Sequence, residues 1–206
     1  MPSGACASSG TASASTPSTR DSSSTIASIP SSRGTTPTRN SCASHSTVHA
    51  LGLKDGIAFP QLIVGEDDRP YMIECAARIP GGQMADLAMH AVGVDLVEIA
   101  LRQALGADVP DELVTPRFQK PLAIRFLTAQ PGPLPTGRVR SVGPLDKVLA
   151  FPGVVQADVY LQVGETIRPV RLDGDRRGYV IATADTNLEA LERAEAASRL
   201  LDVEVE

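Results

Sequence analysis

Apolar residues form two short continuous runs separated by a polar turn soon after residue 55. Residues 57–64 and 71–75 are the apolar runs, and residues 65–70 between them are rich in Gly, Asp and Pro. This arrangement predicts a β-hairpin. Pro60 has no backbone N–H, so we expect the first strand to lie at a sheet edge or to be bulged there.

The pattern then changes to the period of an amphipathic helix. After a break at residues 79–82, apolar residues recur at i, i+3, i+4 and i+7 from Met84, which predicts a helix that Gly93 ends. Asp95 is expected to cap a second helix, and Gly106 is expected to follow its last turn. Residues 107–121 are a connector punctuated by proline.

Beyond residue 121 the pattern predicts a strand-rich unit that closes with a helix. We expect antiparallel strands over residues 122–128, 137–142, 155–163 and 178–183. Val155 is expected to point to the same buried face as the alternate residues that follow it. Thr186 and Glu189 have the spacing of a capping box. The buried stripe of the last helix is expected to comprise Leu188, Leu191, Ala194, Ala197 and Leu201.

The first 48 residues differ from this body in composition. They hold 23 Ser or Thr, three Arg and one Asp, with no Lys, Leu, Phe or Tyr, and so carry a net charge of +2. The rest holds 16 basic and 23 acidic residues, a net charge of −7. Such a Ser/Thr-rich segment cannot bury enough apolar surface to offset the entropy of ordering it, so residues 1–47 are expected to be a disordered tail.

Three origins of this tail stay open from the sequence. It is a flexible linker or arm, or an organellar transit peptide, because Ser and Arg are common in it and acids are rare. It is also what an out-of-frame start on a GC-rich gene would produce, and in that case the tail is not native to the fold.

Composition excludes several classes of protein. No apolar stretch reaches the roughly 18 residues of a membrane span, and the N-terminus lacks the apolar core of a signal peptide. Three cysteines without a Cys-x-x-Cys pair provide neither a disulfide framework nor a zinc site. The acidic body argues against a nucleic-acid surface. We therefore expect a cytoplasmic protein without nucleic-acid or membrane partners.

The most informative polar residues lie in and directly after the hairpin. Gln61 is placed on the first strand and Glu74 on the second, where a carboxylate on an inner strand needs a charged partner or a metal. Arg78 follows four residues later, and Pro80-Gly81-Gly82 then opens onto a helix N-terminus, whose amides can hold an anionic oxygen. The group is a candidate site for a metal–phosphate ligand. The alternatives are that Glu74 pairs structurally with Arg78 or Arg69 and that Gln61 is a hydrogen-bonded core residue.

These residues carry a resemblance to a known family. The stretch Glu74-Cys75-Ala76-Ala77-Arg78 resembles the Glu-x-Asn-x-Arg motif of the ATP-grasp ligases. The run from Leu51 to Gly106 is similar to the C-terminal half of that nucleotide-binding fold. RRGYVIATADTNLEALERAEAA, from Arg176, resembles the β-rich subdomain that follows it in carboxylate–amine ligases and biotin carboxylase-like enzymes. The resemblance extends over residues 48–206.

The resemblance implies a fold, an activity and roles for the site residues. The fold implied is α+β, an antiparallel sheet with helices over residues 48–118 and a β-rich subdomain with a terminal helix over residues 119–206. The activity implied is ATP- and Mg²⁺-dependent (or Mn²⁺-dependent) joining of a small carboxylate to an amine through an acyl phosphate. Glu74, with Gln61 beside it, would bind the metal, and Arg78 would neutralise the transferring phosphoryl group. Pro80, Gly81 and Gly82 would border the substrate or phosphate pocket.

The sequence also departs from the family pattern. Gln61 stands where an acidic ligand is usual, and Ala76 stands where Asn is usual. The preceding domain and the lid that hold ATP in the family would need well over a hundred residues upstream, so we expect this chain to be a truncated ligase that is inactive alone. The alternative function is a non-catalytic binding module that keeps the fold.

Overall fold

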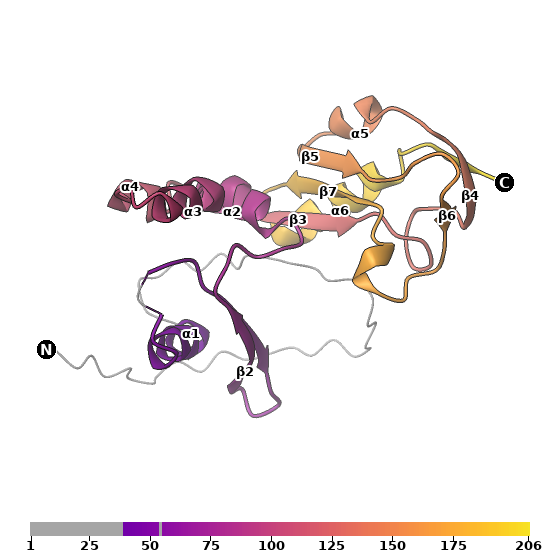
Figure 1. Ribbon diagram of the computed structural model, residues 1–206. Helices are drawn as coiled ribbons and strands as arrows, with labels where there is room; N and C mark the ends of the chain where they lie inside the picture. Colours follow the sequence, from indigo (N-terminus) through magenta and orange to yellow (C-terminus); the bar gives the residue numbers. More distant parts are fainter. Residues whose placement is uncertain (1–38, 54) are drawn as a thin grey trace, which may run out of the picture. The chain divides into compact units, whose positions relative to one another are not determined.

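The computed structural model describes residues 39–53 and 55–206 (Figure 1). Contacts within the chain divide it into two units. The hairpin unit comprises the described residues up to Asp86 together with Val94–Thr115. The C-terminal unit comprises Leu87–Gly93 and Pro116–Glu206. No helix in the described ranges is both long and apolar enough to cross a membrane.

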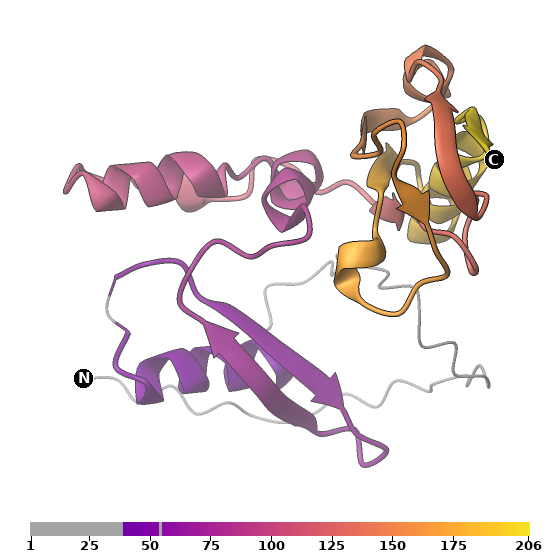
Figure 2. The same ribbon diagram turned by 45° about the vertical axis from the view of Figure 1, so that its right-hand side comes forward.

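The hairpin unit is built on a two-stranded antiparallel sheet, and a helix lies against both strands (Figures 1 and 2). Its elements are α1 (Arg39–Ala50), β1 (Phe59–Val64), β2 (Pro70–Ala76), α3 (Leu96–Ala104) and α4 (Asp111–Val114). The expected hairpin is confirmed. β1 is an edge strand of this two-stranded sheet, which is one of the two positions that Pro60 allows. The pairing shifts between Gln61 and Leu62, and the extra residue, Ile73, lies on β2.

The helix α2 (Met84–Val92) starts in the hairpin unit and ends in the C-terminal unit. Asp95 caps α3 as expected, because its carboxylate accepts hydrogen bonds from the backbone N–H groups of Val97 and Glu98 at 2.9 and 3.0 Å. Gly106 has a φ of 66° after the last turn of α3, the left-handed conformation that ends many helices.

The helix α1 corrects the predicted extent of the tail. Residues 39–47 were assigned to a tail without regular structure, yet α1 begins at Arg39. Packing against β1 and β2 supplies the stability that the composition of this helix does not provide. Residues 39–47 are therefore helical, and the rest of the predicted tail, residues 1–38, lies outside the described residues.

The C-terminal unit contains two three-stranded sheets. Their strands are β3 (Leu122–Phe126), β4 (Gly137–Val142), β5 (Val154–Val159), β6 (Thr166–Ile167), β7 (Gly178–Thr183) and β8 (Val203–Val205). One sheet has the order β3-β7-β5 and the other the order β6-β4-β8. The helices are α5 (Asp146–Leu149) and α6 (Asn187–Ser198), with a short 3-10 turn η1 (Asp173–Asp175). Neighbouring strands in both sheets are antiparallel, as expected.

Alanines let α6 approach the β3-β7-β5 sheet closely. Ala190, Ala194 and Ala197 have no exposed surface, whereas Leu188 is 67% exposed. The expected stripe through Leu188 is therefore wrong at its first residue. The buried face follows the positions where a small side chain allows close contact between helix and sheet, rather than the largest apolar side chains.

A bulge in β5 corrects a second detail. The register of β5 against β7 shifts between Val154 and Gln156, which turns the intervening Val155 outward. Val155 is 40% exposed, while Ala157 and Val159 pack against the core. The sequence predicted uninterrupted alternation from Val155, and the extra residue of the bulge breaks that alternation.

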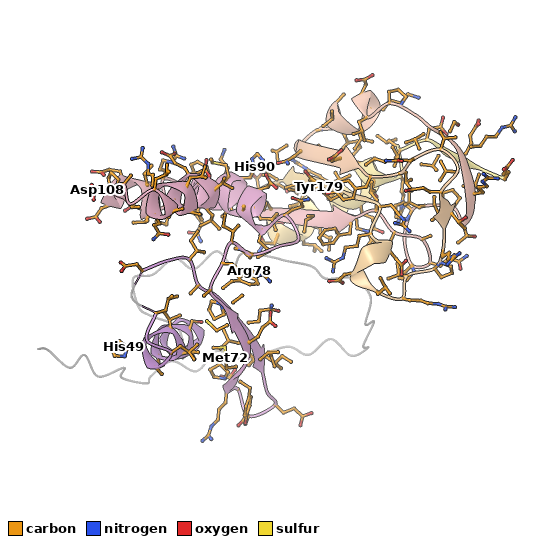
Figure 3. The ribbon with its side chains drawn as sticks, viewed as in Figure 1. His49, Met72, Arg78, His90, Asp108 and Tyr179 are labelled. Atoms are coloured by element: carbon orange, nitrogen blue, oxygen red, sulfur yellow. The ribbon has the colours of Figure 1, made fainter. Side chains whose placement is uncertain are left out.

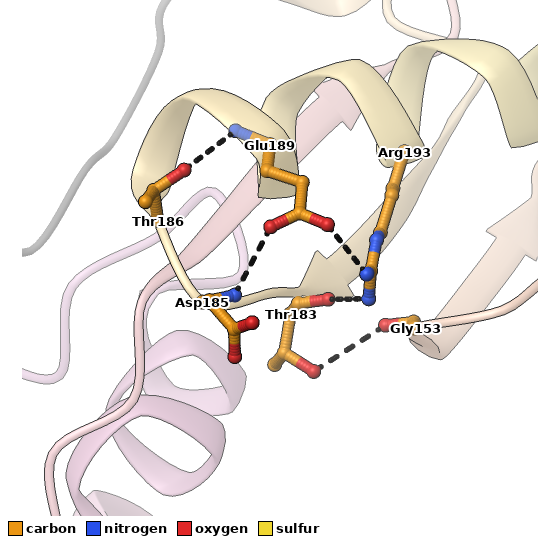
Figure 4. A network of polar contacts seen from close by, with 6 residues as sticks. All are labelled: Gly153, Thr183, Asp185, Thr186, Glu189 and Arg193. Atoms are coloured by element: carbon orange, nitrogen blue, oxygen red, sulfur yellow. Dashed lines mark hydrogen bonds and ion pairs between the residues drawn. The ribbon is translucent and has the colours of Figure 1, made fainter.

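A network of polar contacts fixes the start of α6 (Figure 4). The hydroxyl of Thr186 accepts from the backbone N–H of Glu189 at 3.1 Å, which confirms the predicted cap. The carboxylate of Glu189 in turn binds the Arg193 guanidinium at 2.6 Å, and Arg193 donates to the carbonyl of Thr183 at 3.1 Å. The helix is thereby joined to the end of the central strand β7.

Candidate functional site

The hairpin brings Gln61 and Glu74 together. The two residues are direct partners in the register of β1 and β2, and the amide of Gln61 donates a hydrogen bond to Oε1 of Glu74. Both side chains are exposed. The expectation that Glu74 lies on an inner strand is not met, because β2 has one neighbouring strand within the described residues. The Glu74 carboxylate consequently stays in water and carries little cost of desolvation.

Arg78 lies just beyond β2, where the chain leaves the sheet (Figure 3). Its guanidinium donates to the carbonyl of the adjacent Ile79 at 3.0 Å. No ion pair joins Glu74 to Arg78 or to Arg69 in the described ranges, and Arg69 pairs instead with Asp67 at 3.6 Å. The structure therefore gives no support to the ion-pair alternative for Glu74.

The Pro80-Gly81-Gly82 loop turns the chain into α2. Pro80 is buried, whereas Gly81 and Gly82 are exposed. Gly82 has a φ of 65°, a conformation that favours glycine, and the N–H of Met84 bonds weakly to the Gly81 carbonyl at 3.4 Å. The two exposed glycines lie at the beginning of a helix, which is where anionic oxygens can bind.

The donors at the hairpin suit a magnesium ion that is also held by phosphate oxygens. Oε2 of Glu74 accepts no hydrogen bond within the described residues, so it is available to a cation. No group of three or more His, Cys, Asp or Glu side chains able to hold a metal occurs in the part of the chain that the structure describes. Mg²⁺ commonly uses one or two carboxylates together with phosphates and water, so Glu74 and the amide oxygen of Gln61 fit such a site.

The C-terminal unit contains a hydrogen-bonded chain that runs from α2 to the sheet. Nε2 of His90 lies 3.0 Å from the side-chain oxygen of Gln156 on β5, and the amide of Gln156 donates to the Tyr179 hydroxyl on β7 at 2.7 Å. His90 and Tyr179 are labelled in Figure 3. His90 is therefore a half-buried histidine whose ring is hydrogen-bonded.

Arginines that sequence reasoning did not select gather near the turn η1. A cavity of about 390 Å³ is lined by Arg168, Pro169, Arg171, Leu172 and Asp175. The Asp175 carboxylate accepts from the backbone N–H groups of Arg171 and Leu172 at 2.9 and 3.1 Å, so it shapes the loop. The signal in the sequence was the density of arginine over residues 168–177.

Comparison with solved structures shows that the fold of this chain recurs in several ligases and synthetases. The L-amino acid ligase from Bacillus licheniformis has a TM-score of 0.67 and 18% identity, over 88% of this chain and 44% of that chain. The phosphoribosylglycinamide synthetase from Anaerococcus prevotii has a TM-score of 0.67 and 14% identity, over 82% of this chain and 42% of that chain. The resemblance to the ATP-grasp ligases is confirmed, because the chain has the fold of the C-terminal part of these enzymes.

The sequence match covers fewer residues of the chain than the fold match does. Residues 125–206 match the family model described as L-amino acid ligase C-terminal domain 2. The biotin carboxylase domain of Hydrogenobacter thermophilus 2-oxoglutarate carboxylase, solved with MgADP, has a TM-score of 0.52 and 20% identity, over 71% of this chain and 31% of that chain. No curated protein matches the sequence. The chain thus spans less than half the length of these solved structures.

Proposed function

We propose that this chain is the C-terminal part of an ATP- and magnesium-dependent ligase that joins a small carboxylate to an amine. The observation that carries the proposal is the pairing of Gln61 with Glu74 across the hairpin, followed within eight residues by Arg78 and the exposed glycine loop. The fold of the solved ligases and the family match of residues 125–206 support it. The names of that family and of the Bacillus licheniformis structure favour an amino acid as one substrate.

The reaction proposed proceeds in two balanced steps. A carboxylate oxygen of the acid attacks the γ-phosphorus of ATP, the bond to the β-phosphate oxygen breaks, and ADP leaves. The neutral amine then attacks the carbonyl carbon of the acyl phosphate, inorganic phosphate leaves, and the amine loses a proton to the medium. Both steps concentrate negative charge on phosphoryl oxygens, so catalysis depends mainly on positioning and on neutralising that charge.

Each site residue has a role in this scheme. Glu74 would hold the metal through its free carboxylate oxygen, and Gln61 would orient Glu74 and offer an amide oxygen. A bound Mg²⁺ would neutralise phosphate charge. Arg78 stabilises the transferring phosphoryl group, and its guanidinium is free to do so because its present partner is only a neighbouring carbonyl. The backbone of Gly81 and Gly82 borders the acid or its acyl phosphate.

The test is ADP release by this chain supplied with the ATP-binding part of such a ligase, because the chain alone is expected to be inactive. ATP, an L-amino acid and increasing Mg²⁺ are the additions. We expect Glu74→Gln to lower turnover by at least about a hundredfold, the loss typical of removing a major electrostatic stabiliser. It should also raise the Mg²⁺ concentration needed for half the maximal rate. Stability should change little, because the exposed Gln61–Glu74 contact can be replaced by an amide pair.

The control is Glu192→Gln, which removes one exposed carboxylate on α6 and should leave both quantities unchanged. Unchanged turnover and Mg²⁺ dependence in Glu74→Gln, combined with a lower melting temperature, would assign Glu74 a structural role instead.

A non-catalytic binding module remains the second candidate, and two residues favour it. Gln61 and Ala76 stand where the family pattern has an acid and an asparagine, which leaves Glu74 as the one charged oxygen ligand of that motif. The absence of any ADP release above background when the folded chain is supplied with the ATP-binding part of such a ligase would favour this second function.

A further inference from the structure

A cavity of about 290 Å³ in the C-terminal unit is lined by none of the residues assigned a role above. Its walls come from Arg125 on β3, from the loop 131–133, and from Glu195, Ser198 and Arg199 at the end of α6. Two guanidinium groups therefore border one small cavity.

Arg125 is held in the sheet beside residues that are shielded from water. It pairs with Val180 across the β3–β7 ladder, and its neighbour Ile124 is 2% exposed. Nε of Arg125 is itself buried and has no hydrogen-bond partner. Within the described residues the Arg125 side chain forms no hydrogen bond or ion pair. A guanidinium cannot lose its charge in a protein, so this buried N–H group requires an acceptor.

The acidic residue of the cavity does not provide that acceptor. The Glu195 carboxylate binds Arg199 at 3.0 Å and forms no ion pair with Arg125. The Ser198 hydroxyl donates a hydrogen bond to the Glu195 carbonyl at 2.7 Å. The lining holds two guanidinium groups and one carboxylate, so its net charge is +1.

The loop that closes the cavity is fixed in place. The Thr128 hydroxyl donates to the Pro131 carbonyl at 2.6 Å. Gly132 has a φ of 155°, and a Cβ atom added there would lie 2.0 Å from the Thr128 carbonyl oxygen, so glycine is required. Pro131 and Pro133 have no N–H, which leaves the guanidinium groups as the principal donors of the lining.

We propose that this cavity binds a small oxyanion, either a carboxylate or a phosphate, through the Arg125 guanidinium with Arg199 as the second cation. The planar fork of Arg125 matches two oxygens of such a group. The oxyanion would supply the acceptor that buried Nε lacks and would neutralise the excess charge. The site lies wholly in the C-terminal unit and uses no hairpin residue. Oxyanion binding is therefore tested independently of the proposed ligase activity.

The test is an NMR titration of the full chain that follows the Arg125 Nε–H signal and the Gly132 amide. Sodium phosphate and sodium acetate are added separately, with sodium chloride keeping the ionic strength constant. We expect at least one of them to shift both signals along a saturable curve, and the stronger of the two identifies the type of oxyanion. Shifts that are absent or linear with both salts would overturn the proposal.

Three variants separate this site from general anion attraction. Arg125→Met keeps the length of the side chain and should weaken binding at least tenfold, as read from the Gly132 amide. Arg199→Gln changes a 69% exposed side chain, so it should preserve the fold while weakening binding at least threefold. Arg168→Gln alters the other arginine-lined cavity and should leave the titration unchanged. An equal affinity in Arg199→Gln, or a loss confined to Arg168→Gln, would contradict the assignment even if Arg125→Met failed to fold.

Discussion

The two units differ most in how far their strands are covered. In the C-terminal unit, Leu122 on β3 and Ile181 on β7 have no exposed surface, and every residue over 178–182 is buried. In the hairpin unit no strand residue is fully buried. Ile63 and Ile73 are 59% and 58% exposed.

This contrast separates stability from the proposed chemistry. Burial of apolar surface contributes about 25 cal/mol per Å², so the C-terminal unit accounts for most of the hydrophobic stabilisation. Glu74 and Arg78 lie instead in the hairpin unit, on exposed backbone where a charged ligand can reach them. Catalytic and binding groups commonly occur on such accessible segments held by a better-packed scaffold.

The largest expected effect tests the contrast directly. Ile181→Ala should lower the free energy of unfolding by about 3–4 kcal/mol, because it removes a fully buried side chain from the central strand and leaves a cavity. Ile73→Ala makes the same chemical change at a 58% exposed position and should cost less than about 1 kcal/mol. Urea denaturation followed by circular dichroism measures both. An equal loss of unfolding free energy in the two variants would show that Ile73 is covered in solution.

A glycine pair gives a smaller effect on the same comparison. Gly178 has a φ of 144°, and an added Cβ would lie 2.2 Å from the Asp158 carbonyl oxygen. Gly178→Ala should therefore destabilise the chain by about 2–3 kcal/mol. Gly81 has open space around its Cβ position, so Gly81→Ala should change stability by less than about 1 kcal/mol. Thermal melts of the two variants measure the difference, and a strongly destabilised Gly81→Ala would contradict the open loop.

Sequence patterns predicted those elements whose periodicity is long and clear. The hairpin, the two helices after it, β4, β7 and α6 follow from apolar spacing and from caps such as Asp95 and Thr186. The helix α1 and the strand β8 were missed, because α1 has few apolar residues and β8 is three residues long. Their formation depends on partners distant in the sequence, which local patterns do not contain. The domain boundary after residue 118 stays a prediction.

The candidate site was predictable in part for a similar reason. The hairpin follows from the local pattern, and its turn has five residues. The register shift after Gln61 then places Glu74, rather than Ile73, opposite Gln61, and the pattern did not predict that shift. The sequence could not show that the Arg125 guanidinium lacks a hydrogen-bond acceptor. Its surroundings depend on where the end of α6 and the loop 131–133 meet β3. The sequence signal was an arginine inside the alternating run 122–128, and only tertiary packing shows that it lacks an acceptor.

The smallest effect concerns a carboxylate that stabilises a loop of the C-terminal unit. Hydrogen bonds from the backbone N–H groups of Arg171 and then Leu172, helped by the charge of Arg177, hold the pKa of Asp175 below its ordinary value of 3.8. Because the pKa is lower in the folded state, the ionised carboxylate stabilises the fold above the unfolded-state pKa. That stabilisation is lost as the pH falls through the folded-state pKa.

Asp175→Asn should therefore be slightly less stable than the parent chain at pH 7. The two should converge as the pH is lowered from 4 to 2, which urea denaturation at each pH measures. A difference that stays constant from pH 7 to pH 2 would mean that the loop depends on the shape of the side chain and not on its charge.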